Sequence, residues 1–377
     1  MNIKRIATIS IIVMLILFLS PHASANTDEY YSEQLEASGA ADLSDYLSEE
    51  TLDYMRKIGC ENIEFEKILD VSLESVFELI GSFIKDGISA PIKGFLTASG
   101  AVMLVCVISG FFPDDEKSKL VLNAVCGCFI IIGIFSPSMQ SIRAAASAIG
   151  ACAAFEKALV PVLAAILTVG GNPVTAISFK GSAFAAAQVI EILSENFVLP
   201  LVGICAALGL TGAILPTLRL SAVSDILRKT MTTVLACASG LFIAFLGMKS
   251  ILASGSDSLA VKGIKMASST FVPVIGGALG DAYSSVIGSL SLLRSTVGIY
   301  AVIAFLMIGL PVVINLALWA LAMRFTSAVS DLLDCRVCSE VLKNAGFVFS
   351  MINTLLLLCM AVFIISAGLM ILLKTGA

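Results

Sequence analysis

The stretch with the clearest chemical potential is residues 276–282, which run Gly-Gly-Ala-Leu-Gly-Asp-Ala. Gly276 and Gly280 have the small-xxx-small spacing that lets helix backbones approach closely in lipid, and Gly276 followed by Gly277 can also break a helix. Asp281 is an acid in apolar surroundings, and an acid placed there is costly and often lines a transport path or a pore. The simpler interpretation is that Asp281 caps the helix that follows it.

Other candidate chemistry is sparse. Cys335 and Cys338 have the Cys-x-x-Cys spacing of redox and metal sites, but no second pair of this kind accompanies them, so the signal is weak. The single histidine, His22, lies in a segment that we expect to be cleaved off, which removes imidazole from any catalytic triad, dyad or metal site. We therefore expect no enzyme activity, no cofactor and no metal, and we interpret the ten cysteines as small apolar packing residues.

The composition indicates that these residues are held by membrane helices. Hydrophobic residues make up 58% of the 377 residues, charged residues only 14%, and the mean hydropathy is +0.99. A soluble domain needs more charge than this to wet its surface. The predicted fold is therefore all-α, a polytopic helical membrane protein surrounded by the lipid bilayer. The formal net charge is −5, without the basic footprint of a nucleic-acid partner, so none is expected.

The N-terminus has the three parts of a secretory signal peptide at residues 1–25. Lys4 and Arg5 are followed by an apolar run and then by a small-x-small cleavage site at residues 23–25. An uncleaved anchor is the weaker alternative, because the run is short for a bilayer span. Residues 26–90 then hold 16 acidic and 4 basic residues, and we expect them to form an exported segment with amphipathic helices at 42–58 and 61–89. This segment is either a cap that packs on its own chain or a partner-docking element.

Residues 91–150 are expected to form a transmembrane hairpin and its link. Residues 92–112 can cross the bilayer, the polar residues 113–119 make a tight link, and residues 120–137 can return. If cleavage leaves residue 26 outside, the link lies inside.

The rest of the chain looks like a duplicated unit of residues 151–262 and 263–377. Three short matches occur in the same order at offsets of 112, 111 and 106 residues, which is the signature of an internal repeat. The matching segments are 160–162 with 272–274, 199–202 with 310–313, and 222–227 with 328–333. The first match centres on Pro161 and Pro273.

Both units are predicted to follow one plan, and Gly- or Pro-broken repeats of this kind are typical of transporter-like folds. Each has an interrupted apolar piece, a proline-broken run, an amphipathic link and a final span. In the two units these are 156–171 and 268–281, 197–216 and 296–323, 217–230 and 324–344, and 231–253 and 345–373. Whether the interrupted pieces cross the bilayer or re-enter decides between parallel and inverted repeats, and the loop charges leave that choice open.

Charged and aromatic residues beside the spans are interpreted as structural. Glu156, Lys157 and Arg294 are expected to be interfacial anchors, Asp225 and Asp331 to cap equivalent helices, and Trp319 to lie in the interfacial aromatic belt.

Two stretches together resemble the stage III sporulation protein AE family of endospore-forming bacteria. Residues 271–282 run FVPVIGGALGDA, and residues 289–298 run SLSLLRSTVG, with Arg294 where the family pattern leads us to expect lysine. The resemblance implies a protein of the mother-cell membrane around the forespore. It would belong, with other membrane proteins, to a secretion-like channel complex that joins the two cells. No catalytic residues carry over from the family.

The leading hypothesis is thus a subunit of that complex, needed for late forespore development, and self-association is left open. The other hypothesis is an autonomous secondary transporter with broken-helix inverted repeats. The candidate packing or pore elements are Pro161, Pro273, Gly276, Gly277, Gly280, Asp281 and Arg294.

Overall fold

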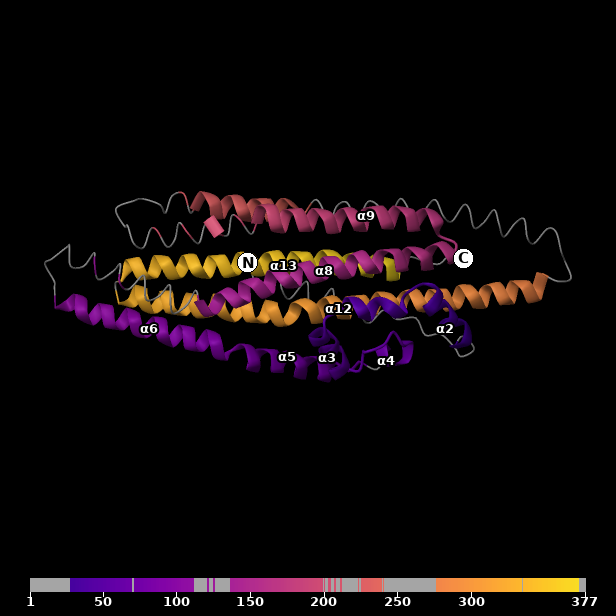
Figure 1. The fold of residues 1–377 in the computed structure, drawn as a ribbon, viewed down its shortest axis with the longest axis horizontal. Coiled ribbons are helices and arrows are strands. Elements are labelled where there is room, and N and C mark those ends of the chain that lie inside the picture. Colours follow the sequence, from indigo (N-terminus) through magenta and orange to yellow (C-terminus); the bar gives the residue numbers. More distant parts are fainter. Residues whose placement is uncertain are drawn as a thin grey trace.

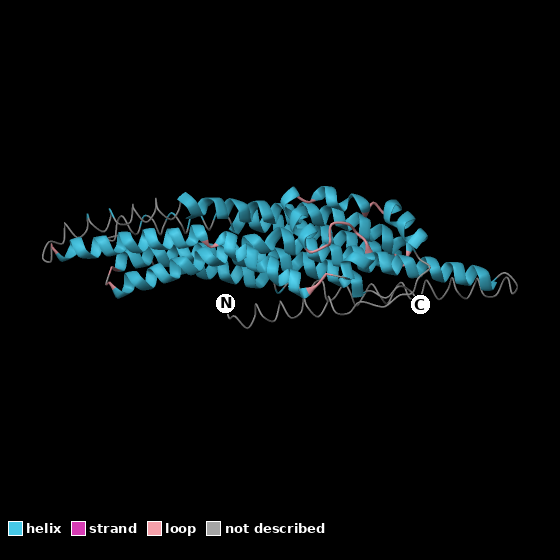
Figure 2. Cartoon of the chain, turned by 90° about the horizontal axis from the view of Figure 1, so that it is seen from below, coloured by secondary structure: helices cyan, strands magenta, loops and turns pink. Residues whose placement is uncertain are grey.

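A computed structural model describes most of the chain. The described residues are 28–69, 71–111, 121, 125, 136–198, 200, 203–204, 207, 211, 223, 225–238, 240, 276–333 and 335–372. The predicted signal peptide, the 113–119 link and Pro273 lie outside them. Within the described part, every regular element is a helix, and the helices lie side by side in an elongated bundle (Figures 1 and 2).

The all-α membrane fold is confirmed. Among the residues that the structure describes, four helical stretches are long and apolar enough to cross a bilayer: 74–108, 138–169, 288–332 and 338–368. They belong to α5 (Leu73–Gly87) with α6 (Ser89–Gly110), to α8 (Ser136–Val169), to α12 (Gly276–Leu332) and to α13 (Arg336–Leu372).

The N-terminal segment is more divided than its amphipathic pattern predicts. In place of two helices it forms α2 (Asp28–Ala37), η1 (Ala41–Tyr46), α3 (Glu49–Lys57), α4 (Phe65–Leu69) and α5. Ser48 and Ser72 each accept a hydrogen bond from a backbone N–H three residues on, and so start α3 and α5 as N-caps. Gly59 has φ +79, a conformation in which glycine avoids a Cβ clash, and it turns the chain after α3.

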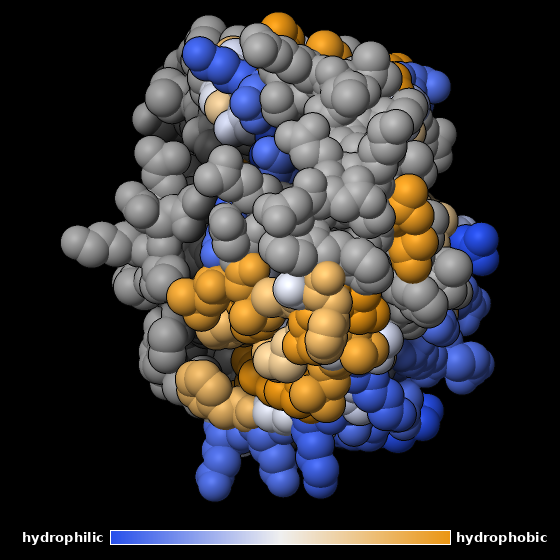
Figure 3. All heavy atoms as spheres, turned by 90° about the vertical axis from the view of Figure 1, so that its left-hand side faces the viewer, coloured by the Kyte–Doolittle hydropathy of each residue, from blue (hydrophilic) through white to orange (hydrophobic). Residues whose placement is uncertain are grey.

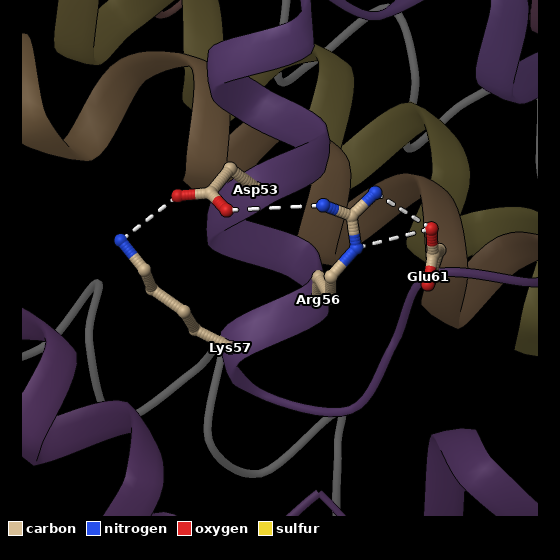
Figure 4. Close-up of polar contacts among 4 residues, drawn as sticks. All are labelled: Asp53, Arg56, Lys57 and Glu61. Atoms are coloured by element: carbon tan, nitrogen blue, oxygen red, sulfur yellow. Dashed lines mark hydrogen bonds and ion pairs between the residues drawn. The ribbon is translucent and has the colours of Figure 1, made fainter.

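Exposed ion pairs lie around this turn. Arg56 donates to Glu61 at 2.8 Å, and Asp53 lies 2.9 Å from the Lys57 ammonium (Figure 4). The hydrogen bond from Lys57 holds the pKa of Asp53 below its usual value, and the bond from Arg56 does the same for Glu61. All four side chains are about half exposed, so water and salt screen these pairs strongly.

The centre of the bundle is the antiparallel pair α12 and α13. Phe305 stacks on Phe363 with ring centroids 5.4 Å apart, and Trp319 stacks on Phe349 at 6.0 Å. The predicted link 324–344 consists of the last turns of α12, which continues to Leu332, and the first turns of α13, which starts at Arg336. The two helices form a hairpin at this point. Asp331 ties the hairpin by accepting hydrogen bonds from Ser339 and Lys343 of α13. It lies in the last turn of α12, where it joins the two helices of the hairpin.

Helix α8 lies antiparallel to α12 and parallel to α13. Its Phe155 meets Phe305 edge-on at 5.2 Å, and its Ser141 donates to Asn315 of α12 at 2.7 Å. After Gly170 and Gly171 the chain reverses into α9 (Pro173–Ile192), which ends in a π-helical turn, Leu193–Val198.

Proline does not break these helices. Pro161 lies inside α8, and Pro311 lies inside α12. Residues 156–169 are therefore the second half of one long helix rather than a separate piece, and the expected break at Pro161 is wrong. Each proline removes one backbone hydrogen bond from its helix, and the neighbouring helices offset this loss.

Candidate functional site

The N-terminal helices are built onto α12, which contacts α2, α3, α4 and α5 (Figure 1). Ser289 of α12 donates to the Gln34 side chain of α2 at 2.9 Å, and Tyr31 of α2 donates to the Ile63 carbonyl at 3.0 Å. Burial raises the pKa of Tyr31, and it raises the pKa of Cys60 to about 12, so both side chains are neutral at physiological pH. The segment expected to be exported is thus a cap on its own chain.

The stretch of α12 under this cap includes residues 289–298, which run SLSLLRSTVG. Ser289, Leu293, Val297 and Tyr300 are completely buried. Arg294, between them, is only 3% exposed, and its Nε and Nη1 atoms bond to none of the described residues. The prediction that Arg294 is an interfacial anchor is wrong, because its guanidinium lies inside the bundle.

A cavity of about 470 Å³ opens where the cap meets the bundle. It is lined from α3 by Glu50 and Tyr54, from α8 by Ser147, and from α12 by Pro311 and Asn315. The Tyr54 hydroxyl donates to Glu50 at 2.6 Å. Because Pro311 has no N–H, the carbonyl of residue 307, which also lines the cavity, loses its usual helix partner. The described lining mixes polar and apolar side chains and carries one carboxylate with no lysine or arginine, so it suits water or a small neutral or cationic group rather than an anion.

Trp319 closes one side of this cavity. It is fully buried against Gly94 of α6 and Phe349 of α13, so the prediction of an interfacial belt position is wrong. Because Gly94 lacks a side chain, the indole can pack directly on the backbone of α6.

Glu156 is a second buried ionisable group, in the middle of α8. It is 0% exposed, and its Oε1 accepts a hydrogen bond from Ser366 of α13 at 2.9 Å. Its Oε2 bonds to none of the described residues. The prediction that Glu156 is an interfacial anchor is therefore wrong. Lys157 points the other way, to Glu191 of α9, at 2.8 Å and partly exposed.

The structure does not gather the predicted packing or pore elements into one site. Pro161 lies on the exposed face of α8, whereas Arg294 is buried on α12. Gly276, Gly277, Gly280 and Asp281 lie in the first two turns of α12. Since α12 begins at Gly276, Asp281 is inside the helix, and the interpretation of Asp281 as an N-cap is wrong. Cys335 and Cys338 are buried at the α12–α13 hairpin.

A signal in the sequence could have found Glu156. Cys152, Glu156, Leu159 and Leu163 recur at spacings of four, three and four residues, and all four are fully buried. This spacing places Glu156 on the packing face of α8 rather than at its surface.

Comparison with known proteins confirms the family resemblance. The family model for stage III sporulation protein AE matches residues 65–374. The stage III sporulation protein AE of Bacillus subtilis (strain 168) is 24% identical over 279 residues, which cover 72% of this chain and 70% of that protein. No solved structure matches the chain. The matched region includes the capped part of α12, the cavity-lining part of α8 and the whole of α13.

Proposed function

Because this chain belongs to the stage III sporulation protein AE family, we propose that this sporulation membrane protein is a subunit of a channel or secretion-like complex linking the mother cell and the forespore. In this proposal it lies in the mother-cell membrane around the forespore, its N-terminal segment is exported after signal cleavage, and its partners are the other membrane proteins of the complex. It supports late forespore development and performs no catalysis itself.

The observation that carries the proposal is the length of α12. Its 57 residues span about 85 Å at 1.5 Å per residue. The hydrocarbon core of a bilayer is only about 30 Å thick, so a helix of this length that crosses it at an ordinary tilt also projects far beyond it. A subunit that must meet partners between two membranes needs such a projection.

The position of the N-terminal helices supports a projection of α12 on the outer side of the membrane. The helices that we expect to lie outside the membrane run along α12 from Ser289 to the cavity around Asn315. Their exposed surface is rich in acids: Glu33, Glu36, Asp42, Asp45, Glu49 and Glu61 all lie at or near it. An acidic surface between two membranes suits docking of a basic partner.

Exposed apolar side chains on the flanks of the bundle favour contacts with neighbouring subunits within the bilayer. Helix α6 exposes a row of large apolar side chains, and α9 exposes another. The residues are Ile92, Leu96, Met103, Leu104, Val107 and Ile108 on α6, and Val174, Ile177, Phe184, Val189 and Ile192 on α9. Figure 3 shows apolar side chains gathered at the end of the molecule where α6 ends and α12 meets α13, with hydrophilic ones along its lower edge. Lipid and adjacent subunits both fit such surfaces.

The transporter hypothesis gains less support. It depends on helices broken at a central site, and α8 and α12 run through Pro161 and Pro311 without a break. Vesicles that hold only this protein should therefore take up no solute.

A deletion strain tests the proposal. Loss of the protein should leave engulfed forespores that shrink and fail to maintain late gene expression, and the wild-type chain should restore both. Forespores of normal size with normal late gene expression in the deletion strain would overturn the proposal. A Gly100→Ala chain, changed at an open position on α6, is the control that should restore the phenotype fully.

A further inference from the structure

We infer that the Glu156 carboxyl is a proton-binding site of the bundle, which holds a proton while α8 packs against α13 and releases it when this seam opens. The ligand class is the proton itself, and the inference does not depend on which complex the protein joins.

The geometry encloses the carboxyl completely. Glu156 is 0% exposed, and Ser366, its hydrogen-bond donor on α13, is 2% exposed. The rings of Phe155, Phe305 and Phe363 form a continuous aromatic contact at the same level of the bundle. On the other side, α9 packs along α8. Water therefore has no open path to the carboxyl while the seam is closed.

No cation described by the structure neutralises the carboxyl. On its own helix, Lys157 is paired with Glu191 of α9 at 2.8 Å. From α12, the Arg294 guanidinium leaves Nε and Nη1 unbonded rather than reaching Glu156. From α13, the titratable neighbour is Cys359, whose thiol lies beside Cys152, one turn before Glu156. The groups facing Glu156 are thus a hydroxyl and two thiols.

These partners suit a neutral carboxyl and not an ion. A buried carboxylate needs a cation or several donors to replace its lost hydration, and one hydroxyl supplies too little. A bound proton removes the negative charge of the carboxyl and needs no additional space. Since Oε1 accepts the bond from Ser366, the proton lies on Oε2, the oxygen that bonds to none of the described residues.

Release of this proton must be linked to movement of the helices. The ion that remains needs water or new donors, and the closed seam offers neither. Parting α8 from α13 near Cys152 and Cys359 would admit water directly beside Glu156. The bound proton and the closed seam therefore stabilise each other.

Infrared difference spectroscopy of the full chain in lipid nanodiscs tests the site during a pH titration. We expect the carbonyl band of a protonated carboxyl to persist at neutral pH, to be lost reversibly at higher pH, and to be absent from Glu156→Gln. Glu191→Gln, the matched control on the neighbouring helix, should retain the band. Ser366→Ala should shift it to higher frequency, because the carbonyl loses its hydrogen bond. A band that survives in Glu156→Gln, or no such band in the folded wild type, would overturn the inference.

Hydrogen exchange tests the link to the seam and does not rely on sporulation. The wild type and Glu156→Gln are compared at one pH, above the point where the wild-type band is lost, so that intrinsic exchange is equal. Faster exchange around residues 152–156 and 359–366 in the wild type is expected. Equal exchange in the two proteins would show that the proton and the seam are independent.

Discussion

The indole of Trp319 packs so closely on Gly94 that a Cβ atom at position 94 would lie 2.7 Å from the Cζ3 atom of the ring. This contact joins α6 to the α12–α13 pair, because the indole also stacks on Phe349 of α13. The ring is held between two helices and has little room to move.

Gly94→Ala should therefore destabilise the bundle. Overpacking of this kind costs about 1–3 kcal/mol in well-packed cores. Gly100→Ala on the same helix has open space around the new methyl and should be neutral or slightly stabilising. Thermal unfolding of the two variants in the same detergent makes the comparison, and an equal loss in both would refute the packing of Trp319 on α6.

Gly298 sets the spacing between α12 and α13. A Cβ there would lie 2.5 Å from Cγ1 of Ile371, close to the stiff branch point of that side chain rather than at its flexible end. Gly298→Ala should cost about 1–3 kcal/mol, and adding Ile371→Ala should recover part of the loss because the clashing atom is gone. Strictly additive losses in the double variant would contradict the contact.

Cys60 should report whether the cap is closed. Burial raises the pKa of its thiol from 9.0 to about 12, so the contribution of this group to stability is complete below pH 9 and is lost as pH rises towards 12. In the folded protein near pH 7 the thiol should react with a water-soluble maleimide far more slowly than in denaturant. Mass spectrometry of the labelled peptide gives both rates, and equal rates would show that Cys60 is not enclosed.

The surface pairs of Figure 4 should matter little for stability. Arg56→Gln removes the bond to Glu61 and the longer contact with Asp53. Both carboxyls have a lowered pKa, so the support from these pairs is present above the ordinary carboxyl pKa and fades as pH falls through the lowered values. At neutral pH, unfolding of Arg56→Gln should differ only slightly from wild type, and the difference should vanish in high salt. A large, salt-independent loss would mean that Arg56 has another role.

Sequence patterns predicted much of this architecture because hydropathy and helical periodicity are local. The apolar helices and the amphipathic character of α3 and α5 follow from side-chain spacing alone. The division of the N-terminal segment depended on caps such as Ser72, a single hydroxyl that periodicity does not register.

The burial of Glu156, Arg294 and Trp319 could not be predicted from local hydropathy and helical periodicity. Their environment depends on which helix covers them, and these contacts join positions as distant as Glu156 and Ser366. Proline was misleading for a related reason. A proline in an isolated helix is disruptive, whereas Pro161 and Pro311 are supported by the helices around them.

Photo-crosslinking in intact sporulating cells tests whether the N-terminal helices form a fixed cap on α12. A benzophenone amino acid replaces Gln34, which bonds to Ser289, or Glu36, which is exposed on the same helix. We expect an intramolecular product that joins the peptide of position 34 to the α12 peptide containing Ser289, with little or none from position 36. A stable, membrane-inserted chain that gives no such product from position 34, or equal products from both positions, would contradict it.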